Sequence, residues 1–176
     1  MLVGRKQILL IPAAVACLLA AVGCDEVNDD RIPRMPVNIE ITHQGMWETY
    51  GVTGFGSSRR FILATDAQEP AGFPYNTQSR TGFGGVLLIM GQSIATGNVE
   101  PLAYDLSCPV ERMPDVRVYV DNYGNFDAVC PKCGSRYNVV EAGGTPSGGQ
   151  ALDFGYGLRR YWVYGTVNGG YIITDY

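Results

Sequence analysis

The feature that most constrains the fold is a pair of cysteines, Cys130 and Cys133, with Gly134 and Ser135 directly after it. Two cysteines separated by two residues close a tight turn whose backbone N–H groups can point at sulfur. Such a turn holds a metal ion, an iron–sulfur cluster or a disulfide. A third cysteine, Cys108, lies upstream. We therefore expect the fold to bring these two segments together at one site.

The rest of the sequence predicts an all-β domain. Apolar–polar alternation or a short apolar run between glycines predicts strands at residues 37–42, 61–64, 86–90, 116–120, 160–164 and 171–174. The last two runs flank Asn168-Gly169-Gly170, which predicts a closing hairpin. No window of a dozen residues has a good helical stripe, although a weak helical turn is possible near residues 66–69.

The composition limits the class of protein and its partners. The 176 residues suit one globular domain, and they include 13 basic residues, 17 acidic residues and a single histidine. Low charge combined with 23 glycines and 11 tyrosines favours short strands and turns. Because no basic stripe is present to neutralise phosphates, we expect no binding to nucleic acid.

The N-terminal residues have the pattern of an export signal. Arg5 and Lys6 precede an uncharged apolar run at residues 8–22, and this run is shorter than the ~20 residues of a membrane span. The run ends in Ala21-Val22-Gly23-Cys24, which resembles a bacterial lipobox. We expect residues 1–23 to be a lipoprotein signal peptide and Cys24 to be lipidated. An ordinary signal peptide with a stray cysteine is the alternative.

Residues 24–36 read as a linker, and residues 37–176 read as a single β domain. The acidic run 25–30 resembles the export tether of lipoproteins from the Bacteroidetes group, although it can also be a solvated spacer. Two prolines, at positions 33 and 36, forbid a helix or a central strand there. This interpretation locates the protein in the cell envelope, lipid-anchored at the periplasmic or outer-membrane surface.

The order of motifs from residue 84 onward resembles the Rieske-type [2Fe–2S] ferredoxin-like domain. Cys108-Pro109 is followed about twenty residues later by the segment from Cys130 to Tyr137, with Gly134, Ser135 and Tyr137 in matching places, and then by a Gly–Pro loop and a final hairpin. The resemblance implies a small β-sandwich or barrel. It also implies a rubredoxin-like cluster-binding tip, formed by loops 108–111 and 130–135.

The ligand set of that family is degenerate here. The resemblance expects a histidine where Val110 stands and a second one where Cys133 stands. The only histidine, His43, lies far upstream and outside the matched region. An ordinary Rieske centre, which takes two histidines on one iron, therefore cannot be built from these loops.

Three interpretations of the cysteines remain open. Cys108, Cys130 and Cys133, with Glu111 as an oxygen ligand, can hold an altered [2Fe–2S] cluster. The same four side chains have the two-knuckle spacing of a zinc ribbon in which one cysteine is exchanged for a carboxylate. In an exported protein, two of the three thiols can also pair as a disulfide in a relic of the site.

These alternatives lead to different functions. We favour an envelope lipoprotein whose Rieske-like domain has lost its normal cofactor and has a binding or structural role with an envelope protein partner. A ferredoxin-like electron carrier with a redox partner and a zinc-stabilised binding module are the alternatives. No acid, base and nucleophile converge in the sequence, so we expect no catalytic residues. The aromatics Tyr161, Trp162 and Tyr164 belong to the final hairpin, or form a contact patch.

Overall fold

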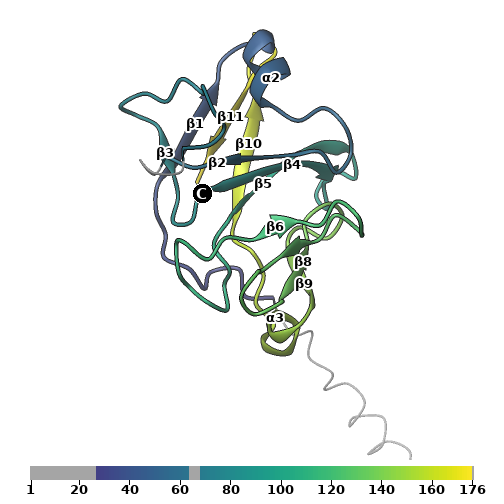
Figure 1. Ribbon diagram of the computed structural model, residues 1–176. Helices are drawn as coiled ribbons and strands as arrows, with labels where there is room; N and C mark the ends of the chain where they lie inside the picture. Colours follow the sequence, from purple (N-terminus) through teal and green to yellow (C-terminus); the bar gives the residue numbers. More distant parts are fainter. Residues whose placement is uncertain (1–26, 64–67, 176) are drawn as a thin grey trace, which may run out of the picture.

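The computed structural model describes residues 27–63 and 68–175, and the signal segment and Cys24 lie outside them. Strands dominate, as predicted. A seven-stranded sheet has the order β2-β4-β5-β10-β11-β1-β3 and curls into a nearly closed, barrel-like layer (Figure 1). Its strands are β1 (Val37–Ile41), β2 (Ser58–Phe61), β3 (Arg80–Thr81), β4 (Val86–Gln92), β5 (Val99–Asp105), β10 (Arg160–Gly165) and β11 (Tyr171–Thr174).

A smaller four-stranded sheet is inserted between β5 and β10. It consists of β6 (Tyr119–Val120), β7 (Ala128–Val129), β8 (Arg136–Asn138) and β9 (Thr145–Gly148), followed by the short helix α3 (Gln150–Phe154). A second helix, α2 (Gln44–Tyr50), lies at the opposite end of the molecule from α3 (Figure 1). The strand pairs of both sheets are antiparallel. The inserted unit therefore forms a tip on the larger sheet.

The apolar patterns explain which strands form and where they are buried. In β1 the residues Val37, Ile39 and Ile41 are buried and alternate with half-buried neighbours, as the sequence pattern predicts for a strand with one face in the core. The predicted hairpin is also present, because β10 pairs with β11 in antiparallel register.

The strand β4 separates two hydrophobic cores. Val86 and Leu88 pack into the core of the larger sheet, whereas Leu87 and Ile89 pack into a second core shared with the tip. All four side chains are 1% exposed or less. The strand predicted at residues 86–90 is therefore present and is buried on both faces. The second core holds the tip against the sheet.

Three local predictions differ from the structure. The strand expected at residues 61–64 lies earlier in the chain, as β2 at Ser58–Phe61. The strand expected at residues 116–120 is reduced to Tyr119 and Val120, because backbone hydrogen bonds tie Val116 and Val118 to the loop after β5. The seven-residue helix α2 was not expected. It has no buried residue, and it begins where the imidazole of His43 accepts a hydrogen bond from the Met46 backbone N–H at 3.3 Å. The cap and the packing of Met46, Trp47 and Tyr50 against the core of the larger sheet support this helix.

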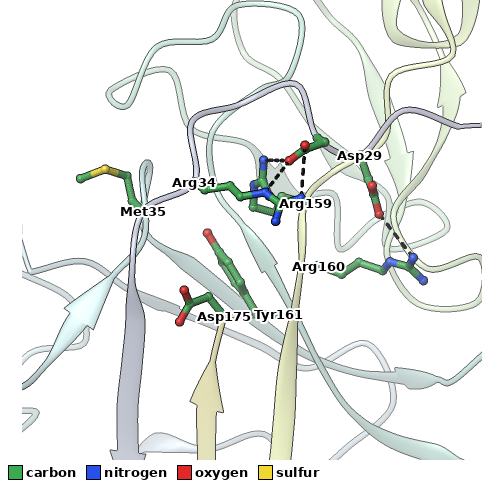
Figure 2. A pocket seen from close by; sticks show the side chains of 8 residues that line it. Asp29, Arg34, Met35, Arg159, Arg160, Tyr161 and Asp175 are labelled. Atoms are coloured by element: carbon green, nitrogen blue, oxygen red, sulfur yellow. Dashed lines mark hydrogen bonds and ion pairs between the residues drawn. The ribbon is translucent and has the colours of Figure 1, made fainter.

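The segment at residues 27–36, expected to be a linker, lies along the domain. The side chain of Ile32 is only 3% exposed. Arg159 pairs with Asp30, and Arg160 Nη2 lies 3.3 Å from Asp29 Oδ2. These ion pairs line a pocket of about 300 Å³ (Figure 2). The prolines prevent regular structure in this segment, but they do not prevent an extended chain from packing.

Candidate metal centre

Both cysteine loops belong to the inserted tip. The first follows β5, and the backbone N–H of Cys108 donates to the Val116 carbonyl at 3.1 Å. The second joins β7 to β8, and the Cys130 N–H donates to the Ser135 carbonyl at 2.9 Å. The Gly134 N–H donates to the Cys130 carbonyl at 3.0 Å, and Gly134 has a φ of 70°. A positive φ favours glycine, so this residue lets the second loop close tightly.

The structure brings the three predicted cysteines together. Their sulfur atoms all lie within 4.8 Å of one another, and the Cys108 and Cys133 sulfurs are 3.7 Å apart. Cys108 and Cys130 are buried, whereas Cys133 is partly exposed. All three are free thiols. The arrangement is therefore a compact three-sulfur cluster with one member at the surface.

Both loops have the same pattern of backbone hydrogen bonds to sulfur. In each, the first cysteine accepts from the N–H groups two and three residues later, which are Val110 and Glu111 for Cys108 and Lys132 and Cys133 for Cys130. Backbone donors of this kind stabilise a thiolate. The turn expected at Cys130 thus directs its N–H groups at sulfur, and the loop at Cys108, for which no such turn was predicted, does the same.

Burial and hydrogen bonding give the thiols different acidities. Burial raises the pKa of Cys108 to about 12, although Tyr137 and two backbone N–H groups act against it. Burial likewise raises the pKa of Cys130. Burial also tends to raise the pKa of Cys133, but hydrogen bonds with Ser135 and with the neighbouring thiols outweigh burial and lower this pKa. The surface thiol is therefore the one most easily deprotonated.

Two hydroxyl groups contact the cluster directly. Tyr137 Oη lies 3.3 Å from Cys108 Sγ, and Ser135 Oγ lies 3.1 Å from Cys133 Sγ. The Ser135 oxygen also accepts a hydrogen bond from the Ala151 backbone N–H at 3.1 Å, at the start of α3. The sequence marked Ser135 and Tyr137 only through the Rieske resemblance, and it did not indicate their contacts with sulfur.

The other predicted residues occupy distinct places. The Glu111 carboxylate pairs with Lys132 Nζ at 2.5 Å, and the group of converging ligand atoms consists of the three cysteine sulfurs. Val110, at the position where the resemblance expects histidine, packs against the core shared with the tip. His43 caps α2 at the far end of the molecule.

The spacing of the sulfurs suits one tetrahedral metal ion. Zn–S bonds of ~2.3 Å at a tetrahedral angle put neighbouring sulfurs about 3.8 Å apart, close to the 3.7 Å between Cys108 and Cys133. A [2Fe–2S] cluster takes two protein ligands on each of two irons. Its four ligands therefore lie farther apart than the ligands of a single metal ion. Three sulfurs within 4.8 Å surround a single point.

The chain matches no protein-family model, no curated protein and no solved structure. Among the described residues, neither helix has the length and apolar character needed to cross a bilayer.

Proposed function

We propose that this chain is a lipid-anchored envelope protein whose Rieske-like domain has lost the [2Fe–2S] ligand set and holds one zinc ion with Cys108, Cys130 and Cys133. The observation that carries the proposal is the convergence of three free thiols from two loops with matching N–H-to-sulfur hydrogen bonds. Structural zinc sites usually have four protein ligands, whereas catalytic sites have three and a water, so three thiolates would leave one position on the ion for water. Cys133 is the partly exposed ligand and would give solvent access to the ion.

The Rieske-like architecture is supported by the order of the elements. The four-stranded tip is inserted between β5 and β10, and both cysteine loops belong to it. This order corresponds to the cluster-binding tip that the resemblance implies. The absence of histidine from both loops in the sequence supports loss of the ordinary cluster.

A zinc ion bound here supplies a cross-link between the two loops. Cys108 belongs to the loop after β5, and Cys130 and Cys133 belong to the loop between β7 and β8. The free energy of metal binding becomes free energy of folding when the site exists only in the folded chain. The proposed role is therefore a binding module whose tip is stabilised by metal, with an envelope protein as partner.

Metal analysis of the full chain, purified without oxygen, tests the proposal. We expect a colourless protein with one zinc per chain and three thiols that react with a thiol reagent only after chelation. A metal-free protein with a disulfide between two of the cysteines would contradict zinc binding and support the relic. Two irons per chain with visible absorbance would support a cluster.

The contacts between hydroxyl groups and sulfur support a second candidate, a ferredoxin-like electron carrier. Hydrogen bonds to ligand sulfurs tune the reduction potential of iron–sulfur centres, and Tyr137 and Ser135 occupy such positions. In this case the Tyr137→Phe variant should keep its iron and change its potential. Under the zinc proposal, Tyr137→Phe changes metal affinity only.

The anchor is supported by the lipobox-like sequence that ends at Cys24. Mass spectrometry of the mature chain should find a diacylglyceryl modification on Cys24, and Cys24→Ser should release the protein from the membrane fraction. An unmodified cysteine in the mature chain would contradict the anchor and leave the metal proposal unaffected.

A further inference from the structure

The first described residues lie directly against α3. The Asn28 N–H donates to the Gly155 carbonyl at 2.8 Å, and Asn28 forms a bridge with Tyr156. Val27 lines a hollow of about 400 Å³ together with Leu152 and Phe154. The N-terminal end of the described chain and the outer side of α3 therefore form one continuous surface at the tip.

This surface exposes large apolar side chains. Leu152 is 55% exposed and Phe154 is 56% exposed, and Ala151 is the only buried residue of the five-residue helix α3. Phe154 packs beside the Tyr156 ring at 5.3 Å. We name the surface formed by Val27, Pro146, Leu152 and Phe154 the α3 face. Two apolar residues that line one hollow and have more than half of their surface in water indicate a contact site.

The proposed anchor lies very near the α3 face. Val27 is three positions after Cys24 in the sequence, and three extended residues span at most about 11 Å. A lipid on Cys24 therefore holds Val27, and with it the α3 face, within that distance of the membrane surface. We propose that the α3 face docks on the bilayer, with Leu152 and Phe154 in the interfacial layer. This inference rests on the lipid anchor of the proposed function.

The charges near the α3 face indicate how it would bind. Asp153 is exposed between the two apolar residues, whereas Asp29 and Asp30 are paired with Arg160 and Arg159. The Arg31 guanidinium lies over the Tyr156 ring, 4.3 Å from its centroid, so an acid and a base both lie near the face and neither sign of charge dominates it. Docking should therefore depend on apolar insertion, occur on zwitterionic lipid and change little with salt.

Docking would also fix the position of the thiol cluster. The Ala151 N–H donates to Ser135 Oγ, which contacts Cys133 Sγ. The helix on the proposed membrane side is thus linked through one hydroxyl to the most exposed cysteine. Figure 1 places α3 and the small sheet at the same end of the molecule. A partner that reaches the metal would have to approach it at the membrane surface.

Lipid-quenching measurements on the full lipidated chain test this inference. Phe154→Trp places a tryptophan on the α3 face. Val167→Trp is the matched control, because Val167 is fully exposed in the turn after β10, beside α2 and at the opposite end of the molecule. Both variants are reconstituted in phosphatidylcholine vesicles with and without brominated acyl chains, and the native Trp47 and Trp162 signals are subtracted.

We expect brominated lipid to quench Trp at position 154 about fivefold more strongly than at position 167, at low and at high salt. Equal quenching in a chain whose Cys24 is lipidated by mass would overturn the docking surface and leave the anchor intact. A blue-shifted but unquenched signal at position 154 would mean that protein covers the face, and would also overturn it. An unmodified Cys24 would overturn both anchor and docking, whereas metal content tests the zinc site separately.

Discussion

The hydroxyl of Tyr161 donates a 2.6 Å hydrogen bond to the buried carboxylate of Asp105, and these two residues stand at the two ends of the inserted tip. Asp105 is the last residue of β5, and Tyr161 is the second of β10. The carboxylate also accepts from the backbone N–H groups of Phe83 at 2.9 Å, Gly84 at 3.0 Å and Ser107 at 2.7 Å. Asp105 therefore connects the end of β5, the start of β10 and the backbone at residues 83–84 at the point where the inserted tip begins.

Replacing Asp105 with asparagine should destabilise the fold by about 2–4 kcal/mol, because an amide nitrogen would face donors that now meet a carboxylate. Tyr161→Phe should cost about 1–2 kcal/mol by leaving one acceptor unpaired. Urea unfolding measures both, and the double variant should show that the two losses are coupled. Tyr164→Phe, at an exposed position of the same strand, is the control and should be neutral.

The stability difference between the wild type and Asp105→Asn should depend on pH. Burial raises the pKa of Asp105 above its ordinary value, against the hydrogen bonds from Tyr161 and the backbone. The folded state then holds the proton more tightly than the unfolded chain, so this residue's contribution falls as pH rises from about 4 through the raised pKa. Urea titrations at pH 4 and pH 8 should find a smaller difference at pH 8. A constant difference would show that the carboxyl titrates alike in both states.

Serine in place of Cys108 or Cys133 should lower zinc affinity at least about 100-fold, because each substitution removes a thiolate ligand. Ser135→Ala should have a smaller effect, about tenfold, since this hydroxyl only orients Cys133. Competition with a chromogenic chelator measures the affinities. Ser147→Ala is the matched control for Ser135, because its hydroxyl bonds Asp127 in the same small sheet. Unchanged affinity in Cys133→Ser would remove this residue from the site.

Zinc binding should release protons and should strengthen as pH rises. Burial raises the pKa of Cys108 to about 12, so this thiol is protonated at neutral pH in the metal-free protein and must lose its proton to bind. Calorimetry in buffers with different ionisation enthalpies counts the protons released. An affinity that does not change between pH 6 and pH 8 would contradict thiolate ligation.

Truncating Ile32 to alanine should destabilise the domain by about 2–4 kcal/mol, because its side chain is 3% exposed within a segment that was expected to be a linker. Met35→Ala is the matched control, since Met35 is 46% exposed three residues later. Thermal unfolding of the two variants tests whether residues 27–36 are packed on the domain or form a free linker. Equal melting temperatures would mean that residues 27–36 add no stability, as a free tether would.

The sequence alone determined the features that depend on neighbouring residues. Alternation predicted β1 and the hairpin of β10 and β11, because the period of a strand is set over a few residues. The spacing of Cys130 and Cys133 predicted a tight turn for the same reason. Cys108 was a candidate from the motif order, but its distance from the other two sulfurs could not be read from a pattern.

Only the tertiary structure decided how these pieces meet. Cys108 and Cys133 are 25 residues apart in sequence, and the core shared by β4 and the tip brings their sulfurs together. The pairing of Glu111 with Lys132 and the packing of Ile32 on the domain likewise depend on chain segments that converge in space. The local sequence pattern cannot predict such contacts, because they depend on how the whole chain packs.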